Sequence, residues 1–130
     1  MQKLIAALLI VLVAILGAMA FQNFRSLAEP KFPTPYQAVV LNGGQVYYGK
    51  LENLAALYPV LRDVFYVVRK ENLETKQVTN VLVRRGKELH GPEFMVLNRQ
   101  SILFIEPVRS DSDIGRSITE QNISEQKKNE

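Results

Sequence analysis

The sequence predicts a mainly β protein in which an N-terminal transmembrane helix (residues 1–21) precedes a small β-barrel or curled antiparallel sheet (36–108) and a disordered tail (109–130). Three observations predict this class. An uncharged apolar run opens the chain, short stretches rich in Val, Ile, Tyr and Phe alternate with turn residues in the middle, and large apolar residues become rare near the end. At 130 residues, the chain has room for one domain.

The membrane prediction rests on the run from Leu4 to Phe21, in which no residue is charged. As a helix, this run would be about 27 Å long, against a hydrocarbon core of about 30 Å. A cleaved signal peptide is the alternative, because Lys3 precedes the run and Ala18-Met19-Ala20 has an A-x-A cleavage pattern. The apolar region of a signal peptide is usually about 7–15 residues, so the longer run favours a retained anchor.

The orientation of this segment follows from weaker signals. Lys3 precedes the run, and Arg25 and Lys31 follow it, so the positive-inside rule supports both orientations nearly equally. The signal-like shape of the segment favours a cell-membrane protein whose C-terminal domain lies outside the cytoplasm. The chain has no cysteine, which excludes disulfides and thiolate metal sites but fits either side of a membrane.

Turn and strand signals divide residues 36–108 into short strands. The clearest is a hairpin in which YQAVVL and QVYYGKLENL flank the turn Asn42-Gly43-Gly44, whose residues tolerate positive φ. Further strands are predicted at 60–70, 77–85, 94–97 and 102–106. Such a small core is marginal alone and leaves open strand edges, so we expect a homo-oligomer or a complex with a membrane protein.

The segments that flank the β region have their own signals. Residues 22–35 are predicted to be a linker, because three prolines between residues 30 and 35 make the chain extended and semi-stiff. Residues 109–130 lack aromatic residues, and their only large apolar residues are Ile114, Ile118 and Ile123. This tail is expected to be disordered, although a short helix there remains an alternative if a partner covers it.

A basic cluster lies at the end of one predicted strand. Arg84, Arg85 and Lys87, with Arg99 further along the chain, are candidates for contact with phosphate in nucleic acid or in lipid headgroups. Glu88 offsets part of this charge, and a solvated strand end is the competing interpretation. The formal net charge of +3 is spread over interspersed charges, so nucleic-acid binding does not follow from overall charge.

No residue pattern predicts catalysis, a cofactor or a metal ion. His90 is the only histidine, and it lies in a loop with Glu88 and Glu93. A metal site needs three or four converging ligands, and a general base needs an orienting partner, and neither is identifiable. Asp111-Ser112-Asp113 is similar to the start of a calcium loop, but Gly115 comes one residue too early. We therefore expect that the protein is not an enzyme.

Three segments resemble a group of small bacterial proteins that have one N-terminal membrane helix and a short β domain. They are YQAVVLNGGQVYYGKL, YPVLRDVFYVV and ELHGPEFMVLNRQSILFIE. The resemblance covers most of residues 1–110. It implies a membrane location and no particular activity.

The layout is also similar to the Sm-like family of small SH3-like barrels. Asn42-Gly43 and Gly49 stand where the first family motif has Asp/Asn-Gly and a later glycine, with Gly44 as one inserted residue. Residues 97–105 keep both isoleucines of the second motif, but Asn98-Arg99 stands where the family has Arg-Gly. Because that pair helps to hold RNA, the resemblance implies a small barrel more than RNA binding. By analogy, it implies rings formed by pairing of edge strands.

These observations lead to three hypotheses about function. The first, which we expect, is a membrane-anchored, non-enzymatic interaction or scaffold module that assembles with itself. The second is a membrane-tethered Sm-like RNA-binding module, which requires a cytoplasmic domain. The third is a secreted or periplasmic ligand-binding domain that is released when a signal peptide is cleaved.

Overall fold

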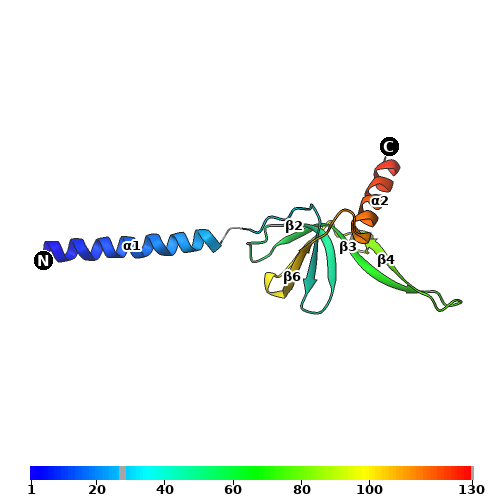
Figure 1. Cartoon of the computed structure of the whole chain (residues 1–130), viewed down its shortest axis with the longest axis horizontal. Coiled ribbons are helices and arrows are strands. Elements are labelled where there is room, and N and C mark those ends of the chain that lie inside the picture. Colours follow the sequence, from blue (N-terminus) through cyan, green and yellow to red (C-terminus); the bar gives the residue numbers. More distant parts are fainter. Residues whose placement is uncertain (27–28, 130) are drawn as a thin grey trace. The chain divides into compact units, whose positions relative to one another are not determined.

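The computed structural model describes residues 1–26 and 29–129 and forms two compact units, Met1–Pro30 and Lys31–Glu130 (Figure 1). The first unit contains α1, Gln2–Ser26, a continuous helix of 25 residues. This helix is long and apolar enough to cross a membrane, a property that signal sequences share.

Helix α1 continues beyond the predicted boundary at residue 21. The polar residues after Phe21 end the apolar span, but none of residues 22–26 is a proline or glycine that would break a helix. The predicted linker 22–35 therefore begins inside α1. Residues 27 and 28 of that linker lie outside the described residues, and the chain is non-helical from residue 29 to the start of the sheet.

The second unit is a six-stranded antiparallel sheet followed by one helix (Figure 1). The main path of the sheet is β4-β3-β2-β1-β6, and β5 pairs with β3 beside this path. The strands are β1 Gln37–Leu41, β2 Val46–Glu52, β3 Val60–Glu71, β4 Val78–Arg84, β5 Phe94–Val96 and β6 Ile102–Pro107. Each predicted strand is confirmed to within two residues at either end.

The strand register defines two faces of the sheet. Across β6, β1, β2, β3 and β4, one row of facing residues is Ile105, Val39, Tyr47, Tyr66 and Val83. We call this face the inner face, because Val39 belongs to the buried core cluster that also contains Leu61, Val64 and Leu97. The adjacent row points to the opposite, outer face. Its residues are Glu106, Ala38, Tyr48, Phe65 and Arg84.

Strand β3 changes partners in its middle. Residues 60–62 pair with β5, whereas residues 65–71 pair with β4. Between these two segments the register against β2 shifts at Gly49, and Asp63 adopts a positive φ of 48°. A Cβ on Gly49 would lie only 2.7 Å from the carbonyl oxygen of Arg62. The bulge therefore requires glycine on β2 where β3 bends past it.

The described sheet is open, and the predicted barrel is not confirmed. β5 and β6 are the two ends of the path β5-β3-β2-β1-β6, and within the described residues they pair with β3 and β1 rather than with each other. A short 3₁₀ helix, η1 Arg99–Ser101, connects them. The Asn98 side chain caps it by accepting a hydrogen bond from the backbone N–H of Gln100 at 3.0 Å.

The structure corrects the prediction of a disordered tail at 109–130. Residues Asp113–Lys128 form helix α2 of 16 residues, which Ser112 caps by accepting a hydrogen bond from the backbone N–H of Gly115 at 3.1 Å. Ile118 is only 2% exposed, and Gly115 is buried against the preceding loop. One fully buried isoleucine and several polar contacts with the sheet, described below, hold a segment whose composition alone suggested disorder.

Candidate functional site

Arg84, the last residue of β4, is the centre of a polar cluster between the sheet and α2. Its side chain is 18% exposed, and its guanidinium carbon lies 4.5 Å from the centre of the Phe65 ring. Its nitrogens lie 3.6 Å from Asp63 Oδ1 and 3.2 Å from Glu125 Oε2. Arg84 Nη2 also donates a hydrogen bond to Asn122 Oδ1. The Arg84 cluster, as we name it, comprises Tyr36, Lys50, Asp63, Arg84, Asn122 and Glu125.

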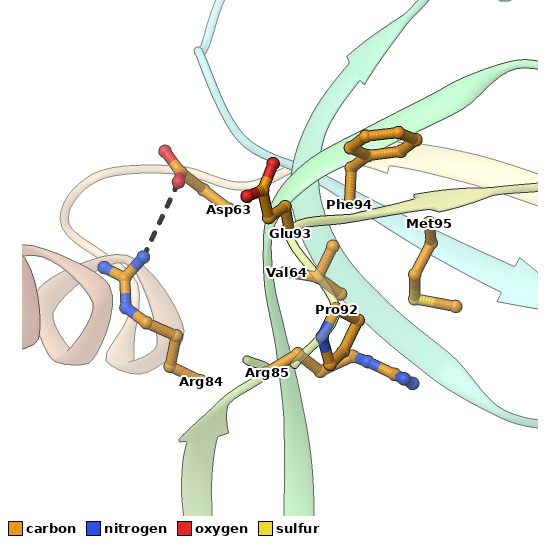
Figure 2. A pocket seen from close by; sticks show the side chains of 8 residues that line it. All are labelled: Asp63, Val64, Arg84, Arg85, Pro92, Glu93, Phe94 and Met95. Atoms are coloured by element: carbon orange, nitrogen blue, oxygen red, sulfur yellow. Dashed lines mark ion pairs between the residues drawn. The ribbon is translucent and has the colours of Figure 1, made fainter. Parts of the chain in front are cut away.

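Asp63 connects this cluster to β2 and to the residue before β1. Lys50 Nζ lies 2.8 Å from Asp63 Oδ2, and the Tyr36 hydroxyl donates to the same oxygen at 3.4 Å. Aspartate is one of the residues that adopt positive φ most readily, which suits Asp63 to the bulge in β3. The bulge thereby places the carboxylate beside the guanidinium of Arg84 (Figure 2).

Helix α2 supplies the other side of the cluster. Asn122 Nδ2 donates to the Tyr36 hydroxyl oxygen at 3.2 Å, so Asn122 joins Tyr36 and Arg84. One residue earlier, Gln121 Nε2 donates to the backbone carbonyl oxygen of Leu82 at 2.9 Å. A polar cavity of about 310 Å³ lies between α2 and the sheet, and the cluster residues line it. The contacts attach α2 to the outer face at the β4 end of the sheet.

The charges in the cluster are those of an ion-pair network. The hydrogen bond to Asp63 raises the pKa of Lys50 above its ordinary value. The same bond, with the positive charges of Lys50 and Arg84, lowers the pKa of Asp63. At neutral pH the lysine is therefore protonated and the aspartate ionised. A protonated amine is not a nucleophile and an aspartate with a lowered pKa is a weak base, so the arrangement suits attachment of α2 rather than proton transfer.

A second cavity, of about 270 Å³, lies between the end of β4 and β5 (Figure 2). Figure 2 shows Arg84 and Arg85 pointing in opposite directions from the end of the strand. Arg85 lies on the inner side, with its guanidinium carbon 5.9 Å from the centre of the Tyr47 ring and Nε 3.3 Å from Glu88 Oε1. The alternation of side chains along a strand explains why two arginines that are adjacent in sequence do not form one basic surface.

The other two predicted contact residues lie elsewhere. Lys87 is exposed in the loop after β4, and among the described residues it has no carboxylate within salt-bridge distance. Arg99 begins η1, where Nη1 donates to the carbonyl oxygen of Ala55 at 3.1 Å and the backbone N–H donates to that of Leu57 at 3.1 Å. Contact of Arg84, Arg85, Lys87 and Arg99 with nucleic acid or lipid headgroups stays a prediction.

The loop around His90 has a structural arrangement of its own. His90 is exposed, and Glu88 accepts a hydrogen bond from the backbone N–H of Gly86 at 2.7 Å. This bond is the main cause of the lowered pKa of Glu88. Glu93 instead lines the second cavity, beside Asp63 (Figure 2). In the part of the chain that the structure describes, no three His, Asp or Glu side chains are placed to share a metal ion.

Sequence reasoning identified only Arg84 of the Arg84 cluster. Asp63 lies within the strand predicted at residues 60–70, and its role depends on a bulge that local sequence does not reveal. Asn122 and Glu125 lie in the segment predicted to be disordered. The signal for them was the spacing of Ile114 and Ile118, one helical turn apart behind a serine cap.

Neither the protein-family models nor the curated proteins include a match to the chain.

Proposed function

We propose that the protein is a membrane-anchored interaction module, in which α1 holds the β domain at a membrane and the domain contacts another protein chain. The observation that carries this proposal is the outer half of the β3–β4 hairpin. The remainder of the domain gives this hairpin a fixed base through the Arg84 cluster.

The hairpin continues past the rest of the sheet (Figure 1). Beyond Tyr66 the structure pairs β3 with β4 alone, up to the pair Glu71 and Val78. All residues from 69 to 80 are exposed, and Leu73 at the tip is 81% exposed. We call residues 68–81 the arm. A two-stranded hairpin with exposed edges is only marginally stable alone, so an arm of this kind suits contact with a partner.

Two further observations support an interaction role over the alternatives. The hydrogen bond between Lys50 and Asp63 raises the pKa of the lysine and lowers that of the aspartate, as in an ion pair, which does not favour catalysis. Arg84 and Arg85 make ion pairs within the domain and point away from each other, so they do not offer the converging cations that RNA binding needs.

The uninterrupted helix supports a retained anchor. The Ala18-Met19-Ala20 pattern lies within α1, with helical residues on both sides, rather than in an extended segment. We propose that the domain lies outside the cytoplasm. Protease digestion of a C-terminally tagged protein in cells with an intact cytoplasmic membrane supports this orientation, whereas digestion only after permeabilisation contradicts it.

We also propose that the domain is a partly open member of the small SH3- or Sm-like barrels. The two ends of the path, β5 and β6, are joined by only the single turn of η1. Asn42, in the β1–β2 turn, contacts η1 twice. Its backbone N–H donates to the carbonyl oxygen of Ser101 at 2.9 Å, and its Nδ2 donates to that of Gln100 at 3.1 Å. These contacts support a curled arrangement that brings both ends of the sheet towards one connection.

The interaction role is tested by the molar mass of the full-length protein extracted from membranes in mild detergent. We expect an assembly larger than a monomer. A matched variant replaces residues 69–80 with a two-residue Asn-Gly turn, because residues 68 and 81 face each other across the hairpin. This variant should fold and be monomeric. A monomeric wild-type protein that also cross-links to no other membrane protein would contradict the proposal.

A further inference from the structure

The backbone of β4 presents alternate residues to an open edge. The N–H of Arg85 donates to the carbonyl oxygen of Val64 at 2.7 Å, and at the other end of the hairpin the N–H of Asn72 donates to that of Gln77 at 2.8 Å. Both bonds assign the odd-numbered residues of β4 to hydrogen bonding with β3. The backbone groups of Val78, Asn80 and Leu82 therefore point away from β3.

Helix α2 marks where this edge stops being open. The Gln121 side chain donates to the outward carbonyl oxygen of Leu82 at 2.9 Å. Two residues beyond Leu82, the guanidinium of Arg84 contacts Asn122 and Glu125 of α2. A carbonyl oxygen has two lone pairs, so Leu82 retains the capacity to accept one more hydrogen bond. The stretch available for pairing is thus residues 78–82.

The other open edges of the described sheet are protected and β4 is not. The part of β3 beyond Tyr66 is open on the side away from β4, and it carries the charged residues Arg69, Lys70 and Glu71. β6 has a register irregularity opposite β1, carries Glu106 and ends in Pro107, and β5 is only three residues long. Residues 78–83 of β4, VTNVLV, contain no charge and no proline, and their register against β3 is regular. Charges, prolines and irregularities are the usual means by which proteins prevent edge pairing, and a regular uncharged edge is a pairing surface.

We propose that β4 pairs antiparallel with β4 of a second copy of this chain, about a two-fold axis at Asn80. This inference rests on the proposed interaction function and names its surface. The axis places Asn80 opposite Asn80 of the second copy, and Val78 opposite Leu82 of that copy. All three outward residues then exchange both backbone hydrogen bonds with their opposites.

The side chains favour a second copy as the occupant. The two-fold axis brings Val78, which is 44% exposed, beside Leu82 on the outer face, and Thr79 beside Val81 on the inner face. Each contact occurs twice, and none joins like charges. The contact also extends the sheet from β3-β4 of one copy into β4-β3 of the other, which gives each two-stranded arm the additional strands that it lacks.

Cysteine cross-linking tests this register directly, because the chain has no cysteine of its own. Asn80→Cys in the full-length protein in its membrane would place two thiols on the axis, at the Cα separation of about 5.5 Å that a disulfide accepts. Leu73→Cys is the matched control, because it lies on the same arm, is 81% exposed, and lies away from the axis. Under mild oxidation, we expect the dimer fraction at position 80 to exceed that at position 73 several-fold.

Asn80→Pro supplies a second measurement. The N–H that proline removes points away from β3, so the hairpin keeps its own ladder, and the loss falls on the pair between copies. We expect this variant to keep the circular dichroism spectrum and lose the assembled molar mass.

Equal cross-linking at positions 80 and 73, or an Asn80→Pro variant that still assembles, overturns the β4 pairing. In that case, if the wild type assembles and the variant without residues 69–80 does not, the interaction function stands without this register. A monomeric wild type removes the β4 pairing, and it removes the interaction function as well if the protein also cross-links to no other membrane protein.

Discussion

The guanidinium carbon of Arg84 lies 4.5 Å from the centre of the Phe65 ring, directly across the β3–β4 pair. Arg84→Met keeps the apolar contact with this buried ring but removes the charge that Asp63 and Glu125 face. We expect the free energy of unfolding to fall by on the order of 2 kcal/mol, because two carboxylates lose a largely buried partner. Denaturant unfolding in detergent, followed by tyrosine fluorescence, measures this change.

Arg69→Met is the control for that experiment. Arg69 is exposed on the arm, and within the described residues it has no carboxylate at salt-bridge distance. Its replacement should change the unfolding free energy by less than about 0.5 kcal/mol. Hydrogen exchange should separate the two variants further, since only Arg84→Met should loosen the amides of α2. Equal losses in both variants would show that the Arg84 cluster does not attach the helix.

Gly115 tests how closely α2 approaches the preceding loop. A Cβ at this position would collide with the carbonyl oxygen of Arg109 and lie 2.9 Å from Ser110 Cα. Helix propensity alone predicts that Gly115→Ala stabilises the helix by up to about 1 kcal/mol. We expect the opposite sign, a loss of about 1–3 kcal/mol, because the backbone must shift. Ser124→Ala, on an exposed part of α2, is the control, and it should be near neutral by thermal unfolding.

Gly49 and Gly43 are two glycines of the predicted hairpin with different environments. A Cβ on Gly49 would lie 2.7 Å from the backbone carbonyl oxygen of Arg62 and 2.8 Å from Leu61 Cγ, in the core. On Gly43 it would meet only the flexible side chain of Gln45. Gly49→Ala should therefore destabilise the domain by about 2 kcal/mol or more, and Gly43→Ala by less than about 1 kcal/mol. Similar denaturation midpoints for the two variants would contradict the tight bulge.

The extent of prediction from sequence follows the range of the interactions involved. The hairpin of β1 and β2 was predicted because turn residues and alternating apolar residues are local signals. The bulge at Asp63 was not predicted, because it depends on the change of pairing partner of β3 from β5 to β4. The Arg84 cluster depends on contacts between residues 38 positions apart, such as Arg84 with Asn122. Composition likewise suggested disorder for α2, since Ile118 is the one large apolar side chain that is fully buried among the described residues of this helix.

Acid should weaken the domain through Asp63. The hydrogen bond from Lys50 lowers the pKa of Asp63 in the folded state, relative to about 3.9 in the unfolded chain. The contribution of ionised Asp63 to the free energy of unfolding is therefore present above about pH 4 and is lost as the pH falls through the folded-state pKa. The side chain is 42% exposed, so solvent screening limits the effect to under about 1 kcal/mol.

Alkali should also weaken the domain, through the lysine of the same ion pair. The pKa of Lys50 is raised in the folded state. The contribution of protonated Lys50 to the free energy of unfolding is therefore complete below about pH 10.4, the pKa in the unfolded chain, and is lost as the pH rises through the folded-state pKa. Asp63→Asn removes the charge while keeping a residue that tolerates positive φ. Denaturation midpoints measured across the pH range should be flatter for this variant at both ends. Identical profiles for variant and wild type would exclude the pair as their source.

The length of α1 predicts that the mature protein keeps its N-terminus. The helix of 25 residues is about 37 Å long, which exceeds the hydrocarbon thickness of about 30 Å, and it continues through Ala18-Met19-Ala20. We expect the membrane-bound protein to resist carbonate extraction and to have the mass of the uncleaved chain. Ala20→Leu is the matched control, because it removes the A-x-A pattern and lengthens the apolar run. Masses that differ only by the Ala20→Leu substitution support the anchor. A wild-type product that begins at Phe21, shorter than the variant, identifies the segment as a cleaved signal.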